Sequence, residues 1–344
     1  MTGGVVNTGS ITNAGEVTIG ETAVNGSATT KPASVITNTN KMTVTGALTN
    51  CEKATINVNQ AAASTTFTLS AASENSGAIN IADGATLTAS AYELTNKGVI
   101  TLNNASALAG GSTLDNENGV IIITDASKSY KLTVPAAGKN GVIKTTVASL
   151  DAIKKAQAKV AAEADKLINT IELTQSIKVE GALDMTGANL SLAAGVKLEV
   201  NDGVTVTCED LVIAGAGASV APYDKNGVKD EPAAKLTAGA VVVAENATFT
   251  VAENLTIGDA CEALTIGKNA TLTNNGDIKA GGTETEVTVN VAEGGKLINA
   301  ATGTMTNANL KIESNKGAIT NNSETAIKVK GGMVGSMNGA FTFN

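Results

Sequence analysis

Apolar and polar residues alternate over short stretches along most of the chain, which predicts many short β-strands. In the first half, a glycine repeatedly precedes two apolar positions that one residue separates. The clearest copies begin at equally spaced glycines: Gly77-Ala-Ile79-Asn-Ile81, Gly98-Val-Ile100-Thr-Leu102 and Gly119-Val-Ile121-Ile-Ile123. This fixed period predicts a solenoid, because one coil cannot bury its own inner face and must stack on copies of itself.

Two further patterns predict the corners between strands. Leu-Thr-Asn occurs at residues 48–50, 94–96 and 272–274, in two cases with a glycine two residues later. Because Asn and Gly adopt a left-handed backbone conformation at low cost, we interpret this motif as a strand end that turns a corner. The second pattern places a glycine or asparagine between two apolar stretches, at Gly84, Gly195, Gly203, Asn246 and Asn254.

We therefore predict an all-β fold, a parallel β-helix (β-solenoid) with coils of roughly 20–25 residues. In such a coil inward Val, Ile and Leu form stacked columns, and Thr, Asn and Lys point outward. The alternative is an antiparallel β-sandwich of many short strands. A sandwich does not need the fixed step between Gly77, Gly98 and Gly119, so the solenoid is favoured.

One stretch departs from the strand pattern and predicts a single amphipathic capping helix at about 149–169. Its apolar residues recur at helical spacing, with lysines and a glutamate on the opposite face. Ser149 fits the N-cap position, and Asp151 lies in the first turn, where the helix dipole favours an acid. The helix divides the chain into a first solenoid segment, 1–148, and a helix-capped second segment, 149–344.

The second segment resembles the right-handed parallel β-helices of the pectate-lyase-like superfamily, because an amphipathic helix directly precedes resumed coils that begin at Thr170-Ile-Glu-Leu. The resemblance implies that the helix covers the edge of the first coil, and a covered edge cannot recruit another strand. The first segment, with copies such as Thr12-Asn-Ala-Gly-Glu-Val-Thr-Ile, looks more like the repeats of filamentous-haemagglutinin-type adhesins.

The composition narrows the classes of partner. The chain has 344 residues, of which 42% are hydrophobic, but only four Phe and three Tyr are aromatic. Its 24 basic residues are all lysine, histidine is absent, and the formal net charge is −8. A chain without a basic patch or stacking planes does not fit a nucleic-acid partner. No run of about 18 apolar residues exists, so no helical membrane span is predicted.

The three cysteines predict buried free thiols. Cys51, Cys208 and Cys261 are odd in number and lack the close spacing of a metal or redox motif. A disulfide between Cys208 and Cys261 would require that the two residues fall on neighbouring coils.

The pectate-lyase-like resemblance raises the hypothesis of a carbohydrate-cleaving enzyme. Lyases of that superfamily typically use Ca²⁺ with an Arg base, and related hydrolases use paired Asp with a nearby His, but this chain has neither Arg nor His. The pairs Glu209-Asp210 and Asp230-Glu231 are adjacent residues, which would point to opposite faces of a strand. We therefore predict no enzymatic activity and no cofactor.

One charged segment is the best candidate for a local function. It runs from Ala221 to Ala233, contains two prolines and interrupts the coils. Asp224, Asn226 and Asp230 offer oxygen ligands for Ca²⁺, although their spacing departs from the EF-hand loop. The alternative is a solvated loop that projects from a corner.

Thr-x-Thr triplets recur along the chain, for example at Thr43/Thr45, Thr66/Thr68, Thr86/Thr88, Thr248/Thr250 and Thr271/Thr273. Stacked on one flat face they would resemble the ice-binding ladders of antifreeze solenoids. The uneven spacing between triplets argues against a regular array, and Thr is a common outward residue on strands.

The two ends of the sequence suggest open coils. The stretch 1–20 contains no predicted helix and no cluster of charge, and the last strand-like stretch carries Phe341 and Phe343. We expect these side chains either to pack on the last coil or to support end-to-end assembly. The N-terminal stretch does not resemble a signal peptide, so either the chain is intracellular or a leader has been removed.

These observations favour a non-catalytic structural or adhesive β-solenoid of a surface, fibre or appendage, in an extracellular or cell-surface location. Its expected partners are proteins, self or host, or glycans. The first alternative is a carbohydrate-binding or carbohydrate-cleaving β-helix. The second is a self-polymerising subunit joined through its terminal coils into an end-to-end homo-oligomer.

Overall fold

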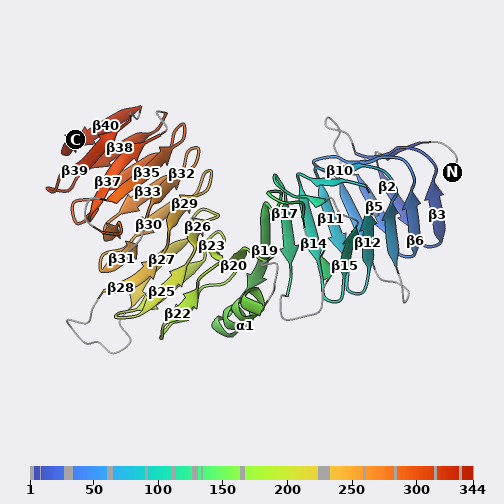
Figure 1. The fold of residues 1–344 in the computed structure, drawn as a ribbon, viewed down its shortest axis with the longest axis horizontal. Helices are drawn as coiled ribbons and strands as arrows, with labels where there is room; N and C mark the ends of the chain where they lie inside the picture. Colours follow the sequence, from blue (N-terminus) through green and yellow to red (C-terminus); the bar gives the residue numbers. More distant parts are fainter. Residues whose placement is uncertain are drawn as a thin grey trace. The chain divides into compact units, whose positions relative to one another are not determined.

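The chain is an all-β parallel β-solenoid with one short α-helix (Figure 1). The computed structural model describes residues 4–7, 9–26, 34–59, 65–89, 92–110, 114–125, 131–132, 135–162, 167–223, 233–258, 261–282, 285–313, 316–332 and 335–343. The predicted fold class is therefore confirmed. The chain divides into two compact units, each described by itself: the N-terminal unit (Met1–Thr146 and Ala158–Asn169) and the C-terminal unit (Val147–Gln157 and Thr170–Asn344).

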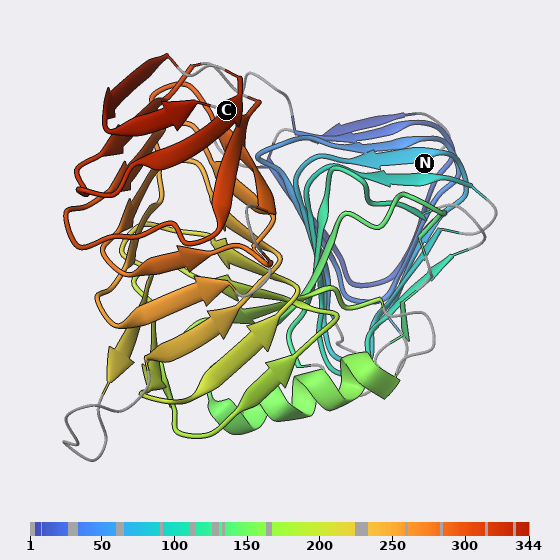
Figure 2. The ribbon, with the colours of Figure 1, turned by 60° about the vertical axis from the view of Figure 1, so that its left-hand side comes forward.

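Three parallel sheets form the N-terminal unit, and Figure 2 shows them around a closed interior. Sheet A comprises β1 (Val5–Asn7), β4 (Ala23–Asn25), β7 (Leu48–Asn50), β10 (Ser73–Asn75), β13 (Leu94–Asn96) and β16 (Leu114–Asp115). Sheet B comprises β2 (Ser10–Asn13), β5 (Val35–Asn38), β8 (Thr55–Val58), β11 (Ala78–Ile81), β14 (Val99–Leu102), β17 (Val120–Ile123) and β19 (Val142–Val147). Sheet C comprises β3 (Glu16–Ile19), β6 (Lys41–Val44), β9 (Thr66–Leu69), β12 (Thr86–Ala89), β15 (Ala107–Gly110) and β18 (Lys131–Leu132).

Stacked aliphatic side chains fill the interior of this unit. On sheet B, identical residues of successive coils lie side by side in one column: Ile56, Ile79, Ile100, Ile121 and Ile143. Each is at most 1% exposed. Full burial of one such side chain contributes about 1.5–3 kcal/mol relative to exposure. The fixed step of the sequence repeat thus corresponds to one coil, and the repeat is a packing period.

A ladder of buried asparagines runs along the corner between sheets A and B. Its members, named the asparagine ladder, are Asn7, Asn25, Asn50, Asn75, Asn96 and Asn116. Each Nδ2 up to that of Asn96 donates to the Oδ1 of the next asparagine at 2.7–2.9 Å, and all six side chains are at most 5% exposed. Several also donate to a backbone carbonyl, as Asn50 does to Ala78 at 3.1 Å. Because buried amides need partners, the ladder satisfies polar groups that the interior would otherwise penalise.

The glycine of the Leu-Thr-Asn-x-Gly corner allows neighbouring coils to stack closely. We predicted that Asn and Gly occur in this motif because the corner needs a left-handed backbone, and that prediction is wrong. Neither Asn50 nor Asn96 has a positive φ, and neither does Gly98. Glycine is required at residue 98 because a Cβ there would lie 2.0 Å from the backbone oxygen of Gly77. In the second corner pattern the left-handed conformation is present, with φ of 72° at Gly84 and 60° at Asn246.

The helix α1 (Leu150–Ala162) begins where the sequence predicts and ends earlier. Ser149 Oγ accepts a hydrogen bond from the backbone N–H of Ala152 at 3.2 Å, as an N-cap does. The prediction of helix up to residue 169 is wrong at its end, since residues 167–169 are not helical. Asn169 instead bonds the chain around the start of β19 through its side chain, accepting from the N–H of Ile143 and donating to the carbonyl of Gly141. The capping role of the helix stays a prediction.

Parallel strands in three groups, named sheets D, E and F, also form the C-terminal unit. Sheet D comprises β20 (Thr170–Leu173), β23 (Asn189–Leu192), β26 (Asp210–Ile213), β29 (Ala240–Val243), β32 (Ala263–Ile266), β35 (Thr285–Val291), β37 (Ala308–Ile312), β39 (Ile327–Gly331) and β41 (Phe341–Phe343). Sheet E comprises β21 (Ile177–Val179), β24 (Lys197–Asn201), β27 (Ser219–Tyr223), β30 (Thr248–Val251), β33 (Thr271–Asn274), β36 (Lys296–Asn299), β38 (Ala318–Asn321) and β40 (Ser336–Gly339). Sheet F comprises β22 (Leu183–Met185), β25 (Thr205–Cys208), β28 (Ala234–Thr237), β31 (Leu255–Gly258) and β34 (Asp277–Lys279).

This unit repeats the packing of the first with coils of less regular length. The coil from Leu211 to its partner Val241 is longer than the predicted range, because the charged segment between the two prolines is inserted into it. A shorter asparagine ladder joins Asn274, Asn299 and Asn321, with side-chain hydrogen bonds of 2.9 Å. No helix in the described ranges is long and apolar enough to cross a membrane.

Candidate functional site

The predicted Ca²⁺ ligands fall in a part of the chain that the structure leaves undescribed. Asp224, Asn226 and Asp230 lie outside the described residues, so this site stays a prediction. Just before them, Tyr223 ends β27, and the Nζ of Lys178 lies 4.9 Å from the centre of its ring. Across the described ranges, no group of three or more His, Cys, Asp or Glu side chains is arranged to hold a metal ion.

The three cysteines are free thiols. Cys208 and Cys261 are buried, and Cys51 is half-buried. A disulfide between Cys208 and Cys261 needs neighbouring coils, but β28 pairs with β25 on one side and with β31 on the other, so one coil separates the two. Burial raises the pKa of Cys208 to about 12 and that of Cys261 to about 11, which keeps both thiols protonated and unreactive.

Sheet C presents a regular array of threonines on its outer surface. The array, named the threonine face, consists of Thr18, Thr43, Thr66, Thr68, Thr86 and Thr88. One column runs through four neighbouring strands, in the order Thr18, Thr43, Thr68, Thr88, and Thr66 pairs with Thr86 beside it. Neighbouring strands lie about 4.8 Å apart, so the hydroxyls and methyls of one column repeat at that distance.

The threonine face is in regular register although the spacing of its triplets along the sequence is uneven. The uneven spacing predicted no regular array, yet Thr43 pairs with Thr68 and Thr68 with Thr88, so this prediction is wrong for sheet C. The strands pair in register although the stretches of sequence between them differ in length. Phe67 and Leu87, each at most 1% exposed, point inward from the same strands and anchor the face.

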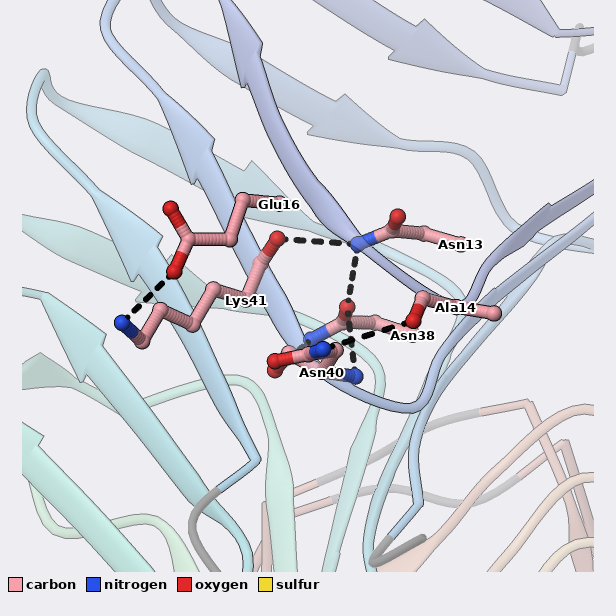
Figure 3. Close-up of polar contacts among 6 residues, drawn as sticks. All are labelled: Asn13, Ala14, Glu16, Asn38, Asn40 and Lys41. Atoms are coloured by element: carbon pink, nitrogen blue, oxygen red, sulfur yellow. Dashed lines mark hydrogen bonds and ion pairs between the residues drawn. The ribbon is translucent and has the colours of Figure 1, made fainter. Parts of the chain in front are cut away.

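A polar cluster borders the threonine face at its β3 end (Figure 3). Lys41 Nζ lies 2.8 Å from Glu16 Oε1, and this hydrogen-bonded ion pair lowers the pKa of Glu16. Beside the pair, Asn13 Nδ2 donates to Asn38 Oδ1 and to the carbonyl of Lys41, both at 2.8 Å. The two charges of this border neutralise each other, so the threonine column beside them remains an uncharged surface.

A second candidate surface is a hollow at the corner between sheets E and F. Its lining, named the corner groove, comprises Ala233, Glu253, Asn254, Leu255, Thr256, Asn275, Gly276, Asp277, Thr302 and Thr304. The groove is open to solvent and has a volume of about 360 Å³. Thr256, Asp277 and Thr304 form one column, because Thr256 pairs with Asp277 and Asp277 bridges to Thr304. The groove therefore runs across successive coils.

The corners on either side give the groove its shape. Asn254 adopts a left-handed conformation with φ of 59°, which turns the chain sharply before β31. At Gly276 a Cβ would lie 2.3 Å from the backbone oxygens of Ala252 and Leu255, so this corner sits directly against its neighbour. The sequence carries a weak signal for this site, since Asp277 directly follows an Asn-Gly corner, but such a corner by itself indicates only a turn.

The aromatic residues predicted to support assembly lie on β41. This strand pairs with β39 of sheet D through Phe341 opposite Ile327 and Phe343 opposite Val329. Phe341 is half-buried, whereas Phe343 is 68% exposed. Packing on the last coil thus covers Phe341 in part and leaves Phe343 in contact with solvent.

Comparison with known proteins does not assign a family. No family model matches the sequence, and no curated protein matches it. Among solved structures, the chain is similar to a TibC-catalysed, hyper-glycosylated TibA fragment, with 14% identity, 98% of this chain and 100% of that chain covered, and a TM-score of 0.23. A similarity at this TM-score carries no argument about this chain.

Proposed function

We propose that the chain is a non-catalytic adhesive β-solenoid whose threonine face contacts a partner surface. The observation that carries this proposal is the register of the face, in which Thr18, Thr43, Thr68 and Thr88 stack on four neighbouring strands. A rigid and uncharged array loses little conformational entropy on contact, because strand backbones and β-branched side chains are already ordered. The partner class is a protein or a glycan on a cell surface, and the location is extracellular.

The non-catalytic part of the proposal rests on the residues available for acid–base chemistry. The sequence contains no His, and all its basic residues are Lys. Glu209 and Asp210 are neighbours in sequence, and the raised pKa of Asp210 comes first from burial and then from the adjacent charge of Glu209. The architecture fits the resemblances to pectate-lyase-like β-helices and filamentous adhesins, and membership of either family remains part of the proposal.

Retention of coated beads under flow tests the adhesive function. Beads that carry the full chain are passed over glass coated with mucin, with fibronectin, or with albumin as the reference. We expect retention on one of the first two coatings and at least a tenfold loss when Thr68→Lys and Thr88→Lys are combined. The matched control is Thr250→Lys with Thr273→Lys, a paired set of outward threonines on sheet E, which should leave retention unchanged.

Two outcomes would contradict this proposal. Retention equal to that on albumin would exclude adhesion to these two surfaces. Equal losses from the sheet C and sheet E variants would show that charge in general, and not the threonine face, governs contact.

Self-assembly is a second candidate function, supported by the exposed side chain of Phe343 on β41. Negative-stain electron microscopy over a concentration series tests it. Filaments or paired rods that disappear in a Phe341→Ser and Phe343→Ser variant would support end-to-end assembly, and isolated particles at every concentration would refute it.

A further inference from the structure

We infer that the corner groove of the C-terminal unit binds an uncharged oligosaccharide, laid along the axis of this solenoid unit. This site goes beyond the threonine face, which belongs to the other unit, and it names a ligand class that the proposed adhesive function leaves open. The inference rests on the extent of the groove, the chemistry of its lining and the fixed position of its central carboxylate.

The extent of the groove fits an extended ligand. Its lining residues come from four successive coils, represented by Ala233, Glu253, Asn275 and Thr302. Strands of neighbouring coils are about 4.8 Å apart, so four coils span roughly 14 Å. The volume of this open groove, about 360 Å³, lies at the lower end of the range of small-molecule sites. A single ion would leave most of this space to water.

The lining chemistry matches a row of sugar hydroxyls. Glu253 and Asp277 supply carboxylate acceptors, and Thr256 supplies a hydroxyl that can donate and accept. The hydroxyls of Thr302 and Thr304 donate within the protein and offer a ligand their acceptor lone pairs. Sugar hydroxyls need partners of both kinds, and a hydroxyl that donates to a carboxylate makes a stronger bond than one between neutral groups. Among the residues that the structure describes, the groove lining contains two carboxylates and no lysine, which disfavours an anionic ligand and favours a neutral one.

The central carboxylate is held in place before any ligand binds. Asp277 Oδ1 accepts hydrogen bonds from the hydroxyls of Thr304 and Thr306, both at 2.8 Å, and from the N–H of Thr306 at 3.3 Å. None of these three bonds uses Oδ2, the second carboxylate oxygen, which can accept from a ligand. Thr302 is fixed as well, since its hydroxyl donates to the carbonyl of Asn275 at 3.0 Å. Fixed polar groups reduce the entropy lost on binding.

The control for this site lies on the same sheet. Asp184 of β22 also accepts at Oδ1 from a threonine, through the N–H of Thr186 at 2.9 Å and its hydroxyl at 2.6 Å. Asp184 differs from Asp277 in that it does not line the groove. Substitution of each aspartate by asparagine keeps the Oδ1 acceptor and replaces Oδ2 with a donor.

A glycan array probed with the labelled full chain, in buffer with EDTA, tests the inference. If the array shows binding, the affinity of the chain for free cellotriose, maltotriose and chitotriose is then measured by titration calorimetry. We expect binding to at least one neutral oligosaccharide, a tenfold or larger loss of affinity in Asp277→Asn and in Glu253→Gln, and no change in Asp184→Asn. Circular dichroism of each variant verifies that the fold is retained.

Each other outcome overturns the inference. Failure to bind any neutral oligosaccharide rejects the ligand class. Binding that requires Ca²⁺ and disappears in EDTA identifies a cation site formed by Glu253 and Asp277. Equal losses in Asp277→Asn and Asp184→Asn reject the groove. The Thr68→Lys and Thr88→Lys variant should bind oligosaccharide normally, so a failed groove and a failed threonine face are distinguishable.

Discussion

Replacement of one asparagine in the middle of the asparagine ladder should lower the free energy of unfolding by several kcal/mol. Asn75 is fully buried; its Oδ1 accepts from Asn50 Nδ2 and its Nδ2 donates to Asn96 Oδ1, both at 2.7 Å. Asn75→Ala leaves one buried donor and one buried acceptor without these partners. An unsatisfied buried polar group costs about 1–3 kcal/mol, so the two together should lower the free energy of unfolding by roughly 2–6 kcal/mol.

The matched control is an asparagine pair that makes the same stacking bond at the surface. Asn80 Nδ2 donates to Asn57 Oδ1 at 2.9 Å on the outer side of sheet B, where both side chains are half-buried. Water can replace this bond, so Asn80→Ala should cost about 1 kcal/mol or less. Urea denaturation gives the free energies, and hydrogen exchange read by mass spectrometry assigns the loss to the N-terminal unit.

Substitution of Asn75 by aspartate adds a second test, because the stability of this variant should depend on pH. In Asn75→Asp, a buried carboxylate would face the Oδ1 of Asn96, and only its protonated form can donate to that oxygen. Burial raises the pKa of such a carboxyl, so the variant should gain stability relative to the original protein as pH falls. Equal costs for Asn75→Ala and Asn80→Ala, or a pH-independent deficit in the aspartate variant, would refute the ladder as a source of stability.

Close packing and burial give three further predictions. Gly98→Ala should prevent normal stacking of the coils, because its Cβ would lie 2.0 Å from a backbone oxygen, whereas Gly181→Ala, with open space around the added carbon, should keep its melting temperature. In the native protein at pH 8 only Cys51 should react with a thiol reagent, and labelling of Cys208 or Cys261 without denaturant would contradict their burial. Since the pKa of these two thiols rises from 9.0 to about 12 and about 11 on folding, the unfolded state loses protons first as pH rises above 9. Stability should therefore fall by about 1.4 kcal/mol per pH unit for each thiol, and an alanine variant at both positions should lack this part of the slope.

The fold is predictable from the sequence because the residues that recur at a fixed spacing are those whose side chains point into the core. The equal steps from Ile79 to Ile100 and from Ile100 to Ile121 reappear as strand pairing in register. The helix start at Ser149 is predictable for a similar reason, since an N-cap is a local feature of the chain. The end of the helix is not, because Asn169 bonds a strand that lies 26 residues earlier in the sequence.

The candidate sites are harder to predict because they depend on which residues of different coils become neighbours. Unequal numbers of residues between the strands hide the register of Thr43, Thr68 and Thr88 in the linear sequence. The corner groove combines Glu253, Asp277 and Thr304, and only the stacking of coils brings them to one hollow. The asparagine ladder is not evident from the sequence because Asn at a corner suggests a backbone conformation, whereas here its side chain points inward.

The asparagine ladder tolerates chain segments of very different size between its rungs, from 18 residues between Asn7 and Asn25 to 25 between Asn50 and Asn75. A foreign peptide grafted into a corner should therefore leave every amide opposite its neighbour. One residue added inside a strand would instead turn the asparagine out toward water. We therefore expect the N-terminal unit to accept exchanged loops and to change its length only by whole coils.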